Sequence, residues 1–418
     1  MPQICPADAF PGLLRPGMTV YLPASGAEPL ALRAALQAQP EAARGVDFLA
    51  AWVPGINDFD YAALHAEARA TAFFVLPAMR ESFRAGKVRV LPLNYAAIAR
   101  WLRDDAAIDL AVVHVAPPDA RGLCSTGILA DFSSLIWDKA ATVVGLVNPA
   151  MPRVRGAPAI AYDRLDVVVE DATPLLTLPR ARVDATYAAI GRRVAELVDD
   201  GTTLQFGVGS LQAAVLESLT GHRDLRLVGG MVSDPLLDLD ASGALSPTAD
   251  VVATLAIGSR QLYDWCGSDP RTRFAPVTET HNVAGLSTID NFFACNGALQ
   301  VDLFGQVNGE SLNGRLVSGP GGLPDYLRSG AMARGGRAVV ALPSSAKGGQ
   351  VSRIVPCLAA GTPVSAARCD AGTVVTEHGA ADLRGLDLDA RAEALIAIAE
   401  PAHREDLAGQ WADLRARL

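Results

Sequence analysis

One glutamate followed by three glycine-bearing segments is the part of this sequence best suited to chemistry. The glutamate is Glu279, in the stretch PVTETHN. The segments are SGPGG (318–322), SSAKGGQVSRIVP (344–356) and VVTEHG (374–379). A carboxylate can attack an activated acyl group, and glycine turns can present backbone N–H groups to the resulting oxyanion. The combination suggests acyl transfer through an acidic nucleophile.

The segment SGPGG has the composition of an anion-binding turn. Pro320 fixes one φ, whereas Gly319, Gly321 and Gly322 can adopt positive φ at no steric cost. Consecutive N–H groups of such a turn can face one concavity. A plain surface turn explains the same residues equally well, so the segment alone leaves both interpretations open.

Two carboxylates are candidates for the nucleophile. Glu279 lies in a polar stretch with His281, which could orient it, although most glutamates are solvated and most such histidines are structural. Glu377 ends a β-type run, with Gly379 two residues later, where ligands of α/β sheets bind. Glu377 could be a nucleophile, a base or a helix cap, and we favour capping or ion pairing.

Another glycine turn, Gly207-Val208-Gly209-Ser210, follows a β-type run and precedes an apolar helical stretch. A strand, a glycine turn and a helix N-terminus in this order can bind phosphate, pyrophosphate or a carboxylate. On this motif alone we favour a tight turn in which glycine only permits the backbone path. The turn lacks the third glycine and the acidic residue of a dinucleotide-binding fingerprint, and no G-x-x-x-x-G-K-[ST] sequence occurs.

The composition limits the partners of the chain. A formal net charge of −9 argues against non-specific binding to nucleic acid or to an anionic membrane. Apolar runs have the length of strands and not the roughly 20 residues of a membrane span, and the first residues do not resemble a secretory signal. The six cysteines form no C-x-x-C pair, so we expect reduced cytoplasmic thiols and no structural metal site.

Short β-type runs alternate with alanine-rich helical stretches, which predicts an α/β fold with mostly parallel sheets. A proline-containing segment, 172–184, separates two halves that open with similar patterns at 17–26 and 201–210. We therefore predict two related α/β domains, 1–180 and 181–418, with the nucleophile and the glycine loops in the second. The predicted strands are 19–23, 48–53, 73–76, 88–93, 110–115, 142–147, 166–170, 203–206, 225–228, 251–257, 298–303, 338–342 and 373–376.

The order of these segments resembles the acetyl-CoA hydrolase/transferase family. Most of the resemblance is carried by NGALQVDLFGQVNGES (296–311), SGPGG, SRIVP (352–356) and VVTEHGAADLRG (374–385). Segments in the first half, such as NPAMPR (148–153), extend it over nearly the whole chain. The resemblance implies the fold of class I CoA-transferases, in which two α/β domains have the active site between them.

The resemblance also implies roles for individual residues. Glu279 matches the nucleophile, and Gly379 resembles the glycine of the oxyanion hole. Gly319, Gly321 and Gly322 resemble the glycine loop on the CoA side, although relatives often carry an aliphatic residue where this chain has Pro320. The residues expected to bind CoA are Gly207, Gly209, Gly319, Gly321, Gly322, Lys347 and Arg353.

The implied reaction is a ping-pong transfer of CoA between a short-chain acyl-CoA and a carboxylic acid, through a glutamyl-CoA thioester. Hydrolysis of a short acyl-CoA by the same glutamate is the alternative, because the two reactions differ only in the access of water to one bond. A non-catalytic binder of CoA metabolites is less favoured. CoA would be a substrate, with no metal or permanently bound cofactor, and we expect a cytoplasmic homodimer.

Overall fold

The computed structural model describes residues 1–207 and 209–418, and these form two compact units. Unit 1 consists of Met1–Pro179, Val252–Thr280 and Val317–Gly319, and unit 2 consists of Arg180–Val251, His281–Leu316 and Pro320–Leu418. Val252–Thr280, which contains Glu279, therefore belongs to unit 1, whereas the sequence suggested a single division near residue 180. The glycine segment 318–322 is divided between the units after Gly319.

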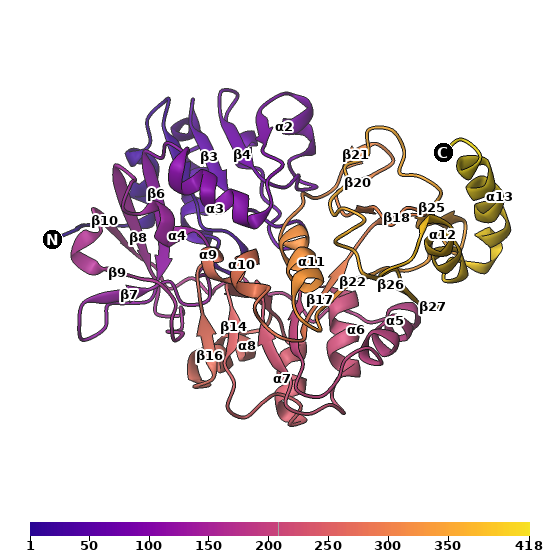
Figure 1. The fold of residues 1–418 in the computed structure, drawn as a ribbon. Helices are drawn as coiled ribbons and strands as arrows, with labels where there is room; N and C mark the ends of the chain where they lie inside the picture. Colours follow the sequence, from indigo (N-terminus) through magenta and orange to yellow (C-terminus); the bar gives the residue numbers. More distant parts are fainter. Residues whose placement is uncertain (208) are drawn as a thin grey trace. The chain divides into compact units, whose positions relative to one another are not determined.

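Unit 1 is built on an eight-stranded sheet whose neighbouring strands all run parallel (Figure 1). Its central strands are nearly continuous in valine and leucine and are buried on both faces, as expected where helices cover both sides. In spatial order the strands are β1 (Gln3–Cys5), β10 (Val167–Glu170), β8 (Thr142–Val147), β6 (Leu110–Val115), β2 (Thr19–Tyr21), β3 (Asp47–Ala50), β4 (Arg69–Ala72) and β5 (Val88–Val90).

A helix of unit 1, α3, packs an apolar face against this sheet. In α3, Tyr95, Ile98, Ala99 and Leu102 are buried at the spacing of one helix face, and the Asn94 side chain caps the first turn. A two-stranded antiparallel sheet pairs β7 (Leu123–Ser125) with β9 (Ala159–Ala161). The helices of unit 1 are α1 (Leu30–Ala38), α2 (Arg80–Arg84), α3 (Tyr95–Asp104), α4 (Ser133–Ile136), α8 (Arg260–Ser268) and α9 (Val277–Thr280), and β16 (Thr272–Phe274) lies between the last two.

Unit 2 is built on a second, mostly parallel sheet. Neighbouring strands run parallel from β12 to β26, and β27 closes the edge as the antiparallel arm of a hairpin. Because these strands are parallel, their carboxyl ends meet at one edge, where open α/β sheets bind ligands. The strands of this sheet whose residues all belong to unit 2 are, in order, β12 (Arg226–Val228), β11 (Thr203–Phe206), β17 (Phe292–Gly297), β22 (Arg337–Ala341), β26 (Thr373–Thr376) and β27 (Gly379–Asp382).

Helices flank this sheet too: α5 and α6 lie side by side, α11 packs on β17 and β22, and α12 lies against α13 (Figure 1). Short strands between β17 and β26 form small sheets, in which β18 (Gln300–Asp302) pairs with β19 (Val307–Asn308) and β25 (Ile354–Val355), and β23 (Ser345–Ala346) pairs with β24 (Val351–Ser352). The helices of unit 2 are α5 (Ala185–Ala195), α6 (Ser210–Ser218), α7 (Pro235–Ala241), α10 (Val283–Leu286), α11 (Leu323–Met332), α12 (Leu388–Ala397) and α13 (Arg404–Arg415).

The α/β fold with mostly parallel sheets is confirmed, and β6, β8, β11 and β26 have the predicted bounds. Two predictions of strands were displaced. The strand predicted at 73–76 lies directly after the observed β4, whose sequence RATA is rich in alanine, a residue with low β-propensity. The strand predicted at 298–303 lies after the observed central strand β17, which was not predicted. Within the described residues, every helix falls short of the length and hydropathy that a membrane crossing requires.

Candidate functional site

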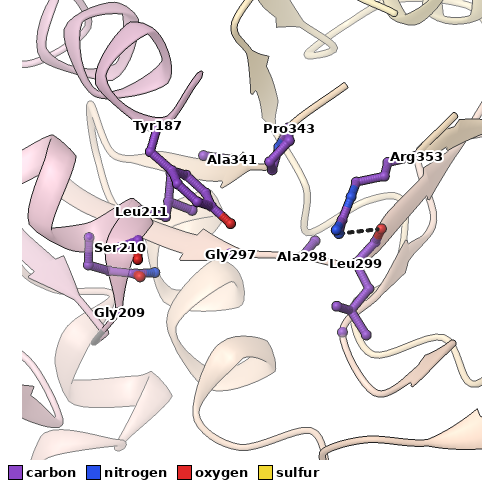
Figure 2. Close-up of a pocket in the computed structure, with 12 residues that line it drawn as sticks. Tyr187, Gly209, Ser210, Leu211, Gly297, Ala298, Leu299, Ala341, Pro343 and Arg353 are labelled. Carbon is purple, nitrogen blue, oxygen red and sulfur yellow. Dashed lines mark hydrogen bonds between the residues drawn. The ribbon is translucent and has the colours of Figure 1, made fainter. Parts of the chain in front are cut away.

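A cavity of about 410 Å³ lies in unit 2 at the carboxyl ends of β11, β17 and β22 (Figure 2). Figure 2 shows side chains from α5, α6 and the loop after β24 converging on it. None of the described residues that line the cavity is acidic. The lining residues are Tyr187, Gly209, Ser210, Leu211, Gln212, Gly297, Ala298, Leu299, Gly309, Ala341, Pro343 and Arg353.

The glycine turn expected to bind an anion forms one wall of this cavity. Gly209 caps α6 with φ +107 and ψ −177, a backbone conformation that essentially only glycine adopts. Gly207 is not a lining residue, but its Cβ position would lie 3.7 Å from Gln212 Nε2, whose residue does line the cavity. Val208 lies outside the described residues. The N–H groups at the start of α6 therefore border the cavity.

Arg353 supplies the positive charge of the cavity. Its backbone N–H donates to the Ser344 carbonyl at 2.8 Å, which fixes the base of the side chain. Its Nη1 donates to the Leu299 carbonyl at 3.4 Å, the contact drawn in Figure 2. Its Nε is buried and has no hydrogen-bond partner among residues 1–207 and 209–418. A guanidinium with an unused donor beside a cavity is suited to a carboxylate or phosphate ligand.

Two further lining residues were missed at the sequence level. Tyr187 has the spacing of an apolar helix face with Ile190 and Val194, yet it lines the cavity, while Ile190 and Val194 are buried. The Asp184 carboxylate accepts a hydrogen bond from the Tyr187 N–H at 2.9 Å and caps the helix one turn before the ring. Gln212 lies on the first turn of α6. The sequence could have indicated Gln212, because it follows the N-cap glycine Gly209 by three residues. Side chains of the first helical turn lie near any ligand that binds at the helix N-terminus.

Gly379 begins β27 directly after the two-residue turn of the β26–β27 hairpin. The turn residues are Glu377 and His378. Both carboxylate oxygens of Glu377 accept hydrogen bonds from Ser344, whose N–H and hydroxyl each lie at 2.8 Å. Glu377 Oε1 also lies 4.0 Å from His378 Nε2, which is the distance of an ion pair when the histidine is protonated, and Ser344 joins Glu377 to the loop that supplies Pro343 to the cavity.

Glu377, His378 and Glu400 place one potential metal-ligand atom each within 4.8 Å of one another. His378 Nε2 lies 3.5 Å from Glu400 Oε2 and 4.0 Å from Glu377 Oε1. Serine hydroxyls already occupy the carboxylates, because Ser345 Oγ donates to Glu400 at 3.0 Å and Ser344 Oγ donates to Glu377. The cluster therefore forms a hydrogen-bonded support for the hairpin turn.

Glu279 lies on α9 in unit 1, where its side chain is 52% exposed. Arg273 Nη2 donates to Glu279 Oε1 at 2.5 Å. Arg273 comes from β16, and the intervening turn brings the two side chains together over six residues. The ion pair therefore places a guanidinium directly against the candidate nucleophile.

His281, two residues after Glu279, belongs to unit 2 and is buried. Its ring centroid lies 4.7 Å from that of Tyr326, and burial lowers the pKa of His281 to about 3. Two glycines make room for the ring, because a Cβ on Gly322 would lie 2.7 Å from its Nε2 and a Cβ on Gly230 would lie 2.9 Å from its Cε1. His281 is therefore a neutral, tightly enclosed imidazole.

The glycine segment 318–322 does not line the cavity of unit 2. In unit 1, Gly319 packs so closely that a Cβ would lie 2.3 Å from the Phe73 carbonyl oxygen. In unit 2, Gly321 has φ +58 and Gly322 precedes α11. Lys347 is exposed in the loop between β23 and β24 with φ +52, outside the cavity lining. Of the predicted CoA-binding residues, the structure brings together Gly209 and Arg353.

The chain matches a known protein family over most of its length. Residues 4–178 match the N-terminal domain of acetyl-CoA hydrolase/transferase and residues 258–411 match its C-terminal domain. A 4-hydroxybutyrate coenzyme A transferase from Clostridium kluyveri is 32% identical over 92% of this chain and 91% of its own length.

Solved structures agree over the full length. RipA from Yersinia pestis superposes with a TM-score of 0.92 at 29% identity, covering 99% of this chain and 98% of that chain. A 4-hydroxybutyrate CoA-transferase from Porphyromonas gingivalis superposes with a TM-score of 0.81 at 30% identity, covering 100% of this chain and 98% of that one. Sequence and structure together place the chain in the acetyl-CoA hydrolase/transferase family, to which it belongs along nearly its whole length.

Proposed function

We propose that this protein is a CoA-transferase that moves CoA between a short-chain acyl-CoA and a carboxylic acid. The cavity of unit 2 carries the proposal. There the N-terminus of α6 and the unused Arg353 donor meet lining residues that, where described, include no carboxylate. In a chain with a net charge of −9, this local excess of donors suits an anion, and CoA and carboxylic acids are both anions. Family membership supports the same reaction.

In the proposed reaction Glu279 is the nucleophile. Its carboxylate oxygen attacks the thioester carbonyl carbon, the C–S bond breaks, and CoA leaves as a thiolate to give a mixed anhydride. The thiolate then attacks the glutamyl carbonyl carbon, which releases the first carboxylate and leaves a glutamyl-CoA thioester. An acceptor carboxylate reverses both steps and regenerates Glu279. The Gly379 N–H stabilises the oxyanion of each tetrahedral intermediate.

Binding away from the reacting bond supports the less favourable anhydride step. We assign Arg353 and Gly209, with the start of α6, to the anionic part of a substrate. Gly207, Lys347 and the segment of Gly319, Gly321 and Gly322 complete the proposed CoA-binding set. CoA acts as a substrate that enters and leaves, so the cycle requires no resident cofactor and no metal.

Hydrolysis of the acyl-CoA is the second candidate, because the family description names both activities. The deciding experiment supplies one acyl-CoA with and without a second carboxylic acid and follows both the new acyl-CoA and the free thiol. We expect new acyl-CoA to form in proportion to the acceptor, with little free thiol. Release of free thiol at the full rate without acceptor would establish hydrolysis instead.

The proposal extends to a cytoplasmic homodimer, which the resemblance to CoA-transferases supports. The chain mass is 43.6 kDa, so light scattering after size-exclusion chromatography is expected to give twice that value. A single-chain mass at assay concentration, with full activity, would rule out the dimer without affecting the proposed reaction.

A further inference from the structure

Ser344 connects the hairpin turn before Gly379 to the cavity of unit 2. Its N–H and hydroxyl donate to Glu377 Oε2 and Oε1, each at 2.8 Å. On its other side, the Ser344 carbonyl accepts the Arg353 N–H at 2.8 Å, and the preceding residue, Pro343, lines the cavity. Ser344 is fully buried, so these bonds form away from competing water.

The turn is also held from two other directions. Arg193 Nε on α5 donates to the Glu377 carbonyl at 2.9 Å, and Thr376 Oγ1 donates to the Ile398 carbonyl at 2.6 Å. The His378 N–H donates to Thr376 Oγ1 at 3.1 Å. These contacts fix the Glu377 side chain, the Glu377 carbonyl and the neighbouring residues Thr376 and His378. The same contacts therefore set the position of the Gly379 N–H, which follows directly in the chain.

We propose that Glu377 is a positioning residue for the reaction, acting through Ser344 to fix Gly379 and Arg353 relative to each other. This inference rests on the proposed CoA-transferase function. It also gives a role to Glu377, the second candidate for the nucleophile, since both of its carboxylate oxygens already accept hydrogen bonds. Both oxygens of Glu377 are tied to Ser344, so the carboxylate acts as an anchor between the turn and the loop.

The proposal is tested by comparing kcat of two variants, Glu377→Ala and Glu377→Gln. Glu377→Ala removes both acceptors, and a displacement of the catalytic geometry by about 1 Å is expected to lower kcat about 100-fold. Glu377→Gln keeps an acceptor for the Ser344 N–H and offers an amide N–H to its hydroxyl, so it is expected to retain kcat within about tenfold. A nucleophile would behave differently, because an amide cannot attack a thioester and both variants would then be equally inactive.

Milder and matched variants complete the experiment. Ser344→Ala removes only the hydroxyl and is expected to lower kcat about tenfold, less in combination with Glu377→Ala because the two share one interaction. Glu393→Ala removes an exposed carboxylate of α12 and is expected to leave kcat unchanged. Unchanged kcat in Glu377→Ala, equal inactivity of the Ala and Gln variants, or additive effects with Ser344→Ala would each overturn the proposal.

Hydrogen–deuterium exchange separates this inference from the proposed function. In Glu377→Ala, amides of both 343–353 and 373–382 are expected to exchange faster, because the two hydrogen bonds from Ser344 to the Glu377 carboxylate are lost. Exchange at the wild-type rate in either segment would overturn the coupling, whatever the enzyme turns over. Conversely, failure of the wild-type protein to transfer or hydrolyse any acyl-CoA would remove the proposed function and leave the measured coupling intact.

Discussion

Arg273 holds Glu279 by a hydrogen bond of 2.5 Å from its Nη2 to the carboxylate Oε1. The Glu279 side chain is 52% exposed and that of Arg273 is 28% exposed, so the pair is partly open to solvent. Exposed ion pairs contribute little to stability, about 0–1 kcal/mol. The Glu279 side chain therefore contributes little to stability in this conformation, so a substitution there can test catalysis without unfolding the protein.

Substituting Glu279 with Gln is expected to abolish transfer, because the amide cannot form the anhydride, while the melting temperature and CoA affinity stay close to wild type. Turnover by mass-detected acyl exchange and CoA binding by calorimetry measure the two effects. Asp264→Asn is the matched control, since Asp264 is a 57% exposed carboxylate paired with Arg260 in the same segment of unit 1. Transfer by Glu279→Gln at more than a tenth of the wild-type rate would exclude Glu279 as the nucleophile.

Arg353→Ala is expected to weaken the binding of CoA about 10- to 100-fold, because a charge-assisted hydrogen bond to the ligand is lost. The loss should be larger at low salt than at high salt, since the missing interaction is partly electrostatic. Calorimetric titration with CoA at two ionic strengths measures both effects. Arg315→Ala, which removes an exposed arginine of the same unit, serves as control. Equal affinities for the two variants would mean that the cavity does not take the anionic part of CoA.

Gly209→Ala is expected to destabilise the protein by about 1–3 kcal/mol, because alanine is strained at φ +107 and ψ −177. Its methyl group would also lie in the cavity wall, so CoA affinity should fall. Thermal unfolding with and without CoA separates the two effects. Gly221→Ala is the control, as nothing lies within 4 Å of its Cβ position and its φ is not positive. A variant as stable as Gly221→Ala would show that the turn adopts another conformation in solution.

His281 should make stability depend on pH. Burial lowers the pKa of His281 from 6.5 to about 3, so the folded protein keeps it neutral where the unfolded chain takes up a proton. A depressed histidine pKa costs stability as the pH falls below the unfolded value. Between pH 7 and pH 5 this residue alone should remove about 2 kcal/mol of the free energy of unfolding.

The comparison for this prediction is urea unfolding of the wild type and His281→Gln at pH 7 and pH 5. The variant is expected to be less stable at pH 7, because it disturbs packing against Tyr326, but to lose less stability on acidification. Parallel losses in the two proteins would show that the imidazole takes up its proton in the folded state.

The sequence predicted the layers of the fold well because buried parallel strands are nearly continuous in β-branched residues. TVVGLV and LAVVHV, for example, became β8 and β6 without a shift. The central strand β17 was missed because FFACNG ends in a buried asparagine and a glycine, residues that are unfavourable in strands. Asn296 is tolerated there because its amide donates to Gln205 Oε1 on the neighbouring β11 at 2.9 Å, a pairing that only the three-dimensional register reveals.

The candidate site was predictable where function depends on backbone conformation and local order. Gly209 was found because a strand, a glycine turn and a helix follow one another within a few residues. Tyr187 was missed because its spacing on α5 equals that of the core residues beside it. The bonds between Ser344 and Glu377 join residues 33 positions apart, and no spacing rule connects such a pair.

The division of the chain into its compact units has a consequence for synthesis on the ribosome. Unit 1 includes Val252–Thr280 and Val317–Gly319, so it cannot be completed until residue 319 has left the exit tunnel. Its first 179 residues emerge before the later segments that they contact in the folded unit. For example, Leu129 forms a β-bridge with Leu255, and the Leu176 carbonyl accepts a hydrogen bond from the Tyr263 hydroxyl. Domains usually fold in the order of synthesis. We therefore expect the amino-terminal part to keep apolar surface exposed until residue 319 has been made, and residues 1–179 expressed alone to be poorly stable.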